Sequence, residues 1–195
     1  MTTTELLIIR HPETEANVEV RFVGRGESPY TERGERQVSL LADRIRAFSP
    51  DAIWTSPLER ARRVAELAAR AGSLPLHTDD RLVELDFGAA EGLTWPEVEA
   101  AGLAFDYRSL DEPVAPGGES RAQIQARSVA FAEHLRALGG RHAVCTHGGV
   151  FRAMLVHFLG LTSSDIWAFH IRNGAIAHVS VTEGHGMIEE FRVHG

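Results

Sequence analysis

The chain has 195 residues, of which 44% are hydrophobic and 24% are charged, and its formal net charge is −7. This length and balance predict one globular domain over residues 1–195, and the negative charge disfavours a broad nucleic-acid surface. No apolar run approaches the roughly 20 residues that cross a bilayer, and the first residues lack the basic and apolar stretches of a signal peptide. We therefore expect no nucleic-acid partner and no membrane partner.

The numbers of cysteines and lysines restrict which catalytic and metal-binding chemistry is possible. Cys145 is the single cysteine, which excludes an intramolecular disulfide and a zinc site made of cysteines alone, so a reducing cytoplasm is the expected location. All 20 residues counted as Lys or Arg are arginines. Without lysine, neither Schiff-base chemistry on a lysine nor a phosphate-binding P-loop lysine is available.

The first elements alternate between strand and helix patterns. Residues 6–9 form an apolar run that predicts a buried strand, which ends at Arg10-His11-Pro12 because proline has no donor for a sheet ladder. Thr31 can cap a helix whose apolar residues recur at helical spacing to about residue 48. Residues 52–54 then predict a second strand.

The next helix has a strong start signal. Ser56 can cap it, Pro57 occupies its first position and Glu59 completes a capping box. We expect this helix to continue to about residue 71, where Gly72 ends it. Residues 74–78 predict a third strand.

The second half begins with a mixed segment and ends in a hairpin. Residues 92–118 are rich in proline and glycine and predict an insertion over the sheet edge, with one short helix after Thr94. Ser120 and Gln123 open a longer helix that ends before Gly139. Residues 143–145 predict a strand, followed by a helix to about residue 159. A short helix near residues 163–168 and a hairpin of residues 175–181 and 187–193 complete the pattern.

Strands that alternate with helices predict an α/β fold of three layers, with a mainly parallel sheet and helices on both faces. Ligands of such sheets bind beyond the carboxyl ends of the strands. Three polar segments lie at predicted strand ends: Arg10-His11, Thr55-Ser56 with Arg60, and Thr146-His147-Gly148. We expect these segments to form one site.

The residues at these strand ends suit phosphoryl transfer. Arg10-His11 alone is a weak signal, since a histidine after a strand often has a structural role, but Arg10 and Arg60 together offer two guanidinium forks for phosphate oxygens. Asn17 can add a donor. Neutral His11 could attack phosphorus, with the arginines stabilising charge on the equatorial oxygens.

Three further residues could complete this chemistry. Glu84 follows a predicted strand and could protonate the leaving alkoxide and then activate water, although its position alone favours an ordinary surface carboxylate. His147 could bind phosphate as a second imidazole, with the Gly148 amide beside it. The ten histidines show no metal-ligand spacing, so we expect neither a metal nor another cofactor.

Taken together, the motifs resemble those of the histidine phosphatase superfamily, which includes cofactor-dependent phosphoglycerate mutases, broad-specificity phosphatases and α-ribazole phosphatases. They occur in the family's order from residue 8 to about residue 152. The matching segments are Arg10-His11-Pro12-Glu13-Thr14-x-x-Asn17, residues 24–34, Thr55-Ser56-Pro57-Leu58-x-Arg60-Ala61, Leu82-x-Glu84-x-x-Phe87-Gly88-x-x-Glu91-Gly92, Pro116-Gly117-Gly118-Glu119-Ser120 and Thr146-His147-Gly148-Gly149.

The resemblance implies a phosphoglycerate mutase-like fold and a metal-independent reaction. It makes His11 the nucleophile and Glu84 the proton donor. It also implies that a set of polar groups holds the phosphoryl group, namely Arg10, Asn17, Arg60, His147 and the Gly148 amide. Three positions depart from the family pattern: Pro12 replaces the usual glycine, Val23 a common glutamine and Tyr30 a common leucine. Pro12 puts the geometry of the nucleophile loop in question, because it removes a backbone donor and fixes φ.

Three functions remain open, and a small-molecule phosphatase is the first. Mutases of the family usually carry a tyrosine where this chain has Phe87, a lysine that this chain lacks altogether, and a pair of arginines where residues 103–112 offer only Arg108. A phosphoglycerate mutase-type phosphotransferase is therefore the second choice. A non-catalytic phosphate-binding regulator is the third, since all the catalytic positions are present.

The substrate itself is a small-molecule phosphate ester of unspecified identity. Phe22, Val23 and Trp95, with Phe105 and Tyr107, could form an apolar wall beside the phosphate, or could simply pack in the core. If they form a wall, aryl or other apolar esters should be preferred over sugar phosphates. The terminal hairpin offers an edge for pairing, so a homodimer is a further expectation.

Overall fold

The computed structural model describes residues 3–106 and 109–193, and its centre is one six-stranded sheet. The strand order is β3-β2-β4-β1-β5-β6. Strands β3, β2, β4 and β1 run parallel, and β5 and β6 are antiparallel additions at one side. The predicted α/β fold with a mainly parallel sheet is confirmed.

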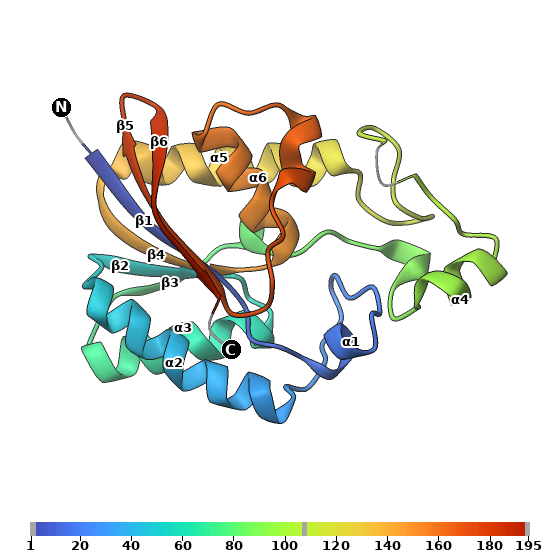
Figure 1. Cartoon of the computed structure of the whole chain (residues 1–195), viewed down its shortest axis with the longest axis horizontal. Helices are drawn as coiled ribbons and strands as arrows, with labels where there is room; N and C mark the ends of the chain where they lie inside the picture. The colour runs from blue at the N-terminus through green and yellow to red at the C-terminus, as the bar shows by residue number, and fades with distance from the viewer. Residues whose placement is uncertain (1–2, 107–108, 194–195) are drawn as a thin grey trace.

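Helices cover both faces of this sheet, as Figure 1 shows. In β1 all four residues from Leu6 to Ile9 are fully buried, because successive side chains of a strand point to opposite faces. Leu6 and Ile8 pack in the core with helices α5 and α6, whereas Leu7 and Ile9 pack with α2 and α3. The continuous apolar run at residues 6–9 therefore marks a central strand of a three-layer fold.

The elements follow the predicted alternation along the chain. They are β1 (Thr3–Arg10), α1 (Glu15–Val18), α2 (Glu32–Phe48), β2 (Ala52–Thr55), α3 (Glu59–Gly72), β3 (Leu76–Thr78), the 3₁₀ helices η1 (Asp80–Leu82) and η2 (Gly88–Ala90), α4 (Trp95–Ala100), α5 (Arg121–Leu138), β4 (Gly140–Thr146), α6 (Gly148–Phe158), η3 (Ser163–Ala168), β5 (Ala175–Thr182) and β6 (His185–Val193). The predicted caps of α2 and α5 are confirmed: Thr31 accepts from Gly34 N, and Ser120 forms a capping box with Gln123.

The predicted start of α3 is wrong. The helix begins at Glu59 with Leu58 as its N-cap, so Ser56 and Pro57 lie before it. The hydroxyl of Ser56 is instead within hydrogen-bond distance of the His147 ring. Gly72 is the last residue of the helix, and Ser73 takes the left-handed conformation that follows it.

The terminal hairpin turns earlier than predicted. Its turn consists of Glu183 and Gly184, with φ values of 53° and 83°, so β6 begins at His185 rather than at Met187. Two residues with positive φ match the twist of the flanking strands. Strand β6 is the outer strand of the sheet, so the edge required for the expected pairing exists, whereas the homodimer itself stays a prediction.

The segment 92–118 lies elsewhere than expected. It extends beyond the carboxyl ends of the strands and not over a sheet edge (Figure 1). The ring of Phe22 contacts the rings of Trp95 and Phe105, and Phe22 N donates to Leu93 O over 2.9 Å. Apolar packing on the loop after α1 therefore fixes this segment. Tyr107 and Arg108, named in the sequence predictions, fall outside the described residues.

None of the described helices combines the length and apolarity needed to cross a membrane.

Candidate active site

The carboxyl ends of β1, β2 and β4 bring the three polar segments together. Arg10 pairs with Thr146 in the sheet register, and His11 N donates to Thr146 O over 2.9 Å. On the other side of β4, Ser56 N donates to Cys145 O over 3.0 Å. Backbone pairing alone therefore places His11, Ser56 and His147 side by side.

His11 is held as a neutral imidazole. Its Nδ1 lies 2.7 Å from Pro12 O, and because a carbonyl oxygen can only accept, Nδ1 carries the hydrogen. The lone pair of the neutral ring then resides on Nε2. Burial first, and then the charges of Arg60 and Arg10, hold the pKa of His11 well below its usual range. Pro12 therefore supports the nucleophile geometry through its carbonyl, despite its missing N–H.

A second imidazole faces the first. The rings of His11 and His147 have centroids 5.1 Å apart, and His147 Nε2 lies 2.8 Å from Ser56 Oγ. Burial and the nearby Arg60 also hold the pKa of His147 well below its usual range. If Ser56 donates to Nε2, Nδ1 of His147 carries a hydrogen. That Nδ1 atom is buried and has no hydrogen-bond partner among the described residues.

Two arginines supply positive charge at the same place. Arg10 donates to Ile171 O, and its Nε is the other buried polar atom without a partner in the described part of the chain. Arg60 enters from α3 and donates to Gly26 O and Gly24 O over 2.6 and 2.8 Å. Burial lowers the pKa of Arg10 to about 10, so the guanidinium still carries its charge at neutral pH.

A buried donor without a hydrogen-bond partner lowers the stability of the folded protein, and a bound anion would supply the missing acceptor. Arg10 Nε and His147 Nδ1 are both donors that phosphate oxygens accept from. Although the net charge of the protein is −7, these groups create a local region of positive electrostatic potential, here called the positive well.

The carboxylate of Glu84 lies at the edge of this well. It accepts from Gly149 N at 3.1 Å and from Leu85 N at 2.9 Å. Glu84 is also a charge neighbour of Arg10 and Arg60. It is therefore held in the site and is not a free surface carboxylate.

The remaining predicted phosphate ligands also lie here. Asn17 Oδ1 accepts from Thr14 and from Asn173 Nδ2, the latter over 2.8 Å, so Nδ2 is the atom with which Asn17 can donate to a ligand. Gly148 begins helix α6, and a Cβ built on it would lie 3.5 Å from Arg10 Cζ. A helix N-terminus at this position favours an anion.

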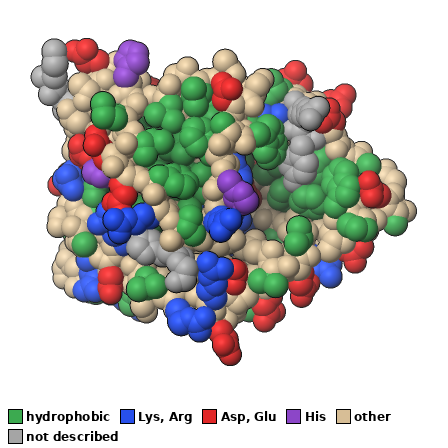
Figure 2. All heavy atoms as spheres, viewed as in Figure 1, with side chains coloured by type: hydrophobic (Ala, Val, Ile, Leu, Met, Phe, Trp, Pro, Cys, Tyr) green, Lys and Arg blue, Asp and Glu red, His purple; other side chains and the backbone are tan. Residues whose placement is uncertain are grey.

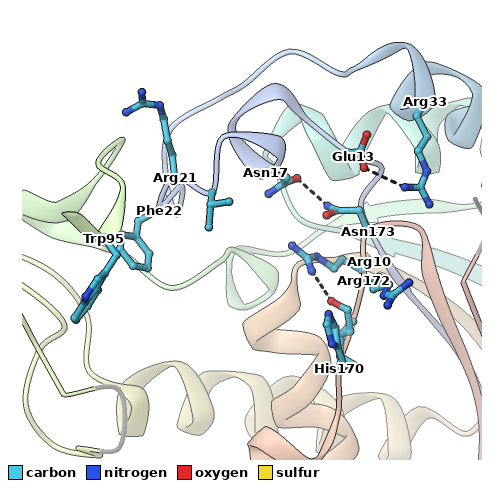
Figure 3. Close-up of a pocket in the computed structure, with 12 residues that line it drawn as sticks. Arg10, Glu13, Asn17, Arg21, Phe22, Arg33, Trp95, His170, Arg172 and Asn173 are labelled. Atoms are coloured by element: carbon cyan, nitrogen blue, oxygen red, sulfur yellow. Dashed lines mark hydrogen bonds and ion pairs between the residues drawn. The ribbon is translucent and has the colours of Figure 1, made fainter. Parts of the chain in front are cut away.

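A cavity of about 420 Å³ lies beside this site, and of the predicted phosphate ligands Arg10 and Asn17 line it. In Figure 3, Phe22 and Trp95 stand on one side of it, and Arg10, Asn173 and His170 on the other. Val23 is not among the described residues that line this cavity; its carbonyl lies 3.5 Å from an Arg60 nitrogen. Figure 2 shows this face hollowed between the body of the molecule and the lobe beyond the strand ends. Of the three residues predicted for an apolar wall, Phe22 and Trp95 therefore line the cavity and Val23 does not, whereas a role of this wall in substrate binding stays a prediction.

Sequence reasoning missed several groups that hold the site. Asn173 donates to Asn17 and lies just before β5, which runs antiparallel and so starts at the carboxyl ends of the parallel strands. Arg127 of α5 donates to the carbonyls of Arg81, Val83 and Glu84 and pairs with Glu119. Reading the hairpin as antiparallel would have pointed to Asn173, whereas no local pattern marks Arg127.

Within residues 3–106 and 109–193, no group of three or more His, Cys, Asp or Glu side chains is arranged to hold a metal ion.

The chain is similar in sequence or in fold to several known proteins. Phosphoserine phosphatase 1 of Hydrogenobacter thermophilus is 30% identical over 197 residues, covering 97% of this chain and 92% of that protein. Probable phosphoglycerate mutase GpmB of Photorhabdus laumondii is 31% identical over 180 residues, covering 90% and 84%. The structure of a mycobacterial glucosyl-3-phosphoglycerate phosphatase complexed with VO3 matches the fold with a TM-score of 0.85 at 24% identity, covering 98% of this chain and 100% of that one.

The family description "Histidine phosphatase superfamily (branch 1)" matches residues 6–194. This match spans the sheet, both helical layers and every predicted site residue. The chain therefore belongs to the histidine phosphatase superfamily.

Proposed function

We propose that the protein is a phosphatase that hydrolyses small-molecule phosphate monoesters through a phosphohistidine on His11. One observation carries the proposal: a buried, neutral imidazole whose Nδ1 is bound to Pro12 O leaves its Nε2 lone pair available between two guanidinium groups. The phosphoserine phosphatase relative supports hydrolysis as the outcome.

In the first half-reaction, Nε2 of His11 attacks phosphorus and the bond to the ester oxygen breaks. Arg10, Arg60 and His147 donate to the equatorial oxygens, where charge develops. Protonated Glu84 gives its proton to the departing alkoxide, which leaves as an alcohol. The products of this step are the free alcohol, a phosphohistidine and an ionised Glu84.

In the second half-reaction, water replaces the alcohol. Ionised Glu84 takes a proton from the water as its oxygen attacks phosphorus, and the N–P bond breaks. Inorganic phosphate leaves, His11 is neutral again and Glu84 is protonated. The sum is one water consumed for each ester hydrolysed, and no step requires a metal ion.

Trapping the intermediate tests this proposal. The enzyme is mixed with a ³²P-labelled ester in the presence of EDTA and quenched, and label on protein should be acid-labile and base-stable, as expected of phosphohistidine. His11→Ala should lose the label and at least about 1,000-fold in kcat, while the exposed His185→Ala serves as matched control. Label retained in His11→Ala, or full activity of that variant, would contradict the mechanism.

A phosphoglycerate mutase-type phosphotransferase is the second candidate, because one relative bears the name probable phosphoglycerate mutase. Phe87 in place of the usual tyrosine and the absence of lysine favour hydrolysis. Incubation with 3-phosphoglycerate and its bisphosphate primer separates the two activities. Efficient formation of 2-phosphoglycerate would make the mutase the better assignment.

We also propose that the enzyme works in the cytoplasm. The single cysteine, Cys145, is buried and free, so the chain forms no intramolecular disulfide of the kind common in oxidising compartments. Cell fractionation with an antibody to the chain checks this location.

A further inference from the structure

Glu84 lines a second cavity, of about 520 Å³. It lies between the start of α5, helix α6 and the 3₁₀ helix η3. Its wall includes Glu84, Phe87, Ile124, Arg152, Ile166 and Trp167. Among the described residues, Arg10 and Asn17 line the first cavity and Glu84 lines this one.

The residues that line each cavity indicate where the leaving group binds. The general acid must lie within hydrogen-bond reach of the oxygen that it protonates. That oxygen is bonded to the organic part of the ester, so the organic part must begin beside Glu84. Because Glu84 lines the second cavity, this cavity is the space available to the leaving group.

The walls of the second cavity are mainly apolar. Phe87 and Ile124 are buried, with 9% and 4% of their surface exposed, whereas Trp167 at the rim is 51% exposed. A half-exposed indole is a large apolar surface that a ligand could cover. The guanidinium carbons of Arg121 and Arg152 lie 5.5 and 5.9 Å from the centre of this ring. These cation–π contacts hold the indole in position at the rim.

We propose that the second cavity is the leaving-group subsite, and that Trp167 determines specificity for esters of apolar alcohols. The inference rests on the proposed phosphatase function. It differs from the sequence prediction, which placed the apolar wall at Phe22 and Trp95. Those two rings pack on each other and on Phe105 and serve to fix the segment 92–118.

Two matched esters and two matched tryptophan variants test this subsite. Ethyl phosphate and 2-phenylethyl phosphate release alkoxides of similar basicity, so the ratio of their kcat/KM values reports apolar contact. We expect wild type to prefer the phenylethyl ester by about tenfold or more, and Trp167→Ala to lose about tenfold of that preference. Trp95→Ala, from the first cavity, should keep the ratio of the two kcat/KM values within about twofold.

Each other outcome overturns the inference. The subsite is contradicted if wild type shows no preference for the phenylethyl ester, or if Trp95→Ala lowers the preference while Trp167→Ala keeps it. In both cases hydrolysis persists, so the phosphatase function stands and the subsite fails. Hydrolysis of neither ester, or full activity of His11→Ala, rejects the proposed function and the subsite with it.

Discussion

Gly149 is the residue that leaves room for the catalytic carboxylate. A Cβ at this position would overlap Glu84 Oε1 and lie 2.8 Å from Ile124 Cδ1. Oε1 is the far end of a flexible side chain, so Gly149→Ala should displace the carboxylate and leave the fold intact. We expect kcat for alkyl phosphates to fall about 100-fold, the lower range of a general acid's contribution.

The leaving group provides the control for this prediction. 4-Nitrophenolate departs without protonation, so Gly149→Ala and Glu84→Gln should both lose far less kcat/KM, which reports the first half-reaction, on 4-nitrophenyl phosphate than on ethyl phosphate. Steady-state kinetics with the two esters, together with thermal unfolding of each variant, make the comparison. An equal loss on both esters would mean that Gly149 acts on phosphate binding and not on the acid.

The protonation state of His11 sets the acid side of the pH profile. Burial and two neighbouring guanidinium groups hold the pKa of His11 well below its ordinary value of 6.5. As the pH falls, the imidazole therefore stays neutral and nucleophilic past the point where an exposed histidine would be protonated. We expect kcat/KM for ethyl phosphate to show no loss between pH 7.5 and 6.5 from the nucleophile. A fall by half or more across that interval, recorded at constant ionic strength and after correction for protonation of the ester, whose second pKa is about 6, would contradict this assignment.

The residues that we propose as catalytic could be selected from the sequence because the proposed chemistry needs particular side chains at strand ends. His11, Arg60 and Glu84 carry recognisable functional groups in motifs of fixed spacing. Gly149 and Asn173 were not predicted, since their roles arise from contacts with residues 65 and 156 positions away. Such contacts depend on how segments pack, and no local pattern encodes them.

At the scale of elements, α5 acts as a clamp on the segment that carries the acid. Arg127 on this helix donates to the carbonyls of Arg81, Val83 and Glu84, and it pairs with Glu119 over 2.7 Å. This segment has no regular hydrogen-bond ladder of its own after η1. A single guanidinium therefore fixes the backbone on which Glu84 stands.

Removing this clamp should affect both stability and activity. Arg127→Met removes a donor from three carbonyls and two hydrogen bonds from a mostly buried Glu119 carboxylate. We expect a loss of about 3 kcal/mol in the free energy of unfolding, as for other broken buried ion pairs, and a lower kcat. Urea unfolding and steady-state kinetics measure the two effects.

Arg136→Met on the same helix is the matched control for Arg127. Its exposed ion pair with Glu133 should matter little to stability. Equal destabilisation by the two variants would reject the clamp.

The observed ends of the helices agree with the predicted ends wherever a local capping interaction determines them. Helix α5 begins where Ser120 and Gln123 predict, because their side chains bond the first turn. Helix α3 begins later than predicted, because the Ser56 hydroxyl turns toward His147 and the active site. A tertiary contact at a functional residue overrode a good local cap.

At the scale of the whole molecule, the layers were predictable but the placement of the insertion was not. Apolar runs and helical periodicity determined a parallel sheet between two helical layers. The segment 92–118 contains few periodic residues, and its position depends on aromatic packing against Phe22. The composition of such a segment predicts irregular structure, but it does not predict where the segment lies in the fold.

Burying two neutral histidines at the centre of the molecule ties its stability to pH. The pKa values of His11 and His147 are held well below 6.5, first by burial and then by nearby positive charge, whereas in the unfolded chain both histidines regain ordinary pKa values near 6.5. Below that pH the unfolded state therefore binds up to two more protons than the folded state. The free energy of unfolding must then fall as the pH falls through this window, by about 2–3 kcal/mol in total at one pH unit below the unfolded pKa.

A double variant isolates this contribution from that of the carboxylates. His11→Asn with His147→Asn removes both titrating rings, so its loss of stability between pH 7.5 and 5.5 should be smaller than that of wild type by about 2–3 kcal/mol. Urea unfolding of both proteins at the two pH values gives the difference, since the contributions of other groups cancel. An equal loss in both would show that the two rings are protonated in the folded protein, and a neutral His11 nucleophile would then be untenable at that pH.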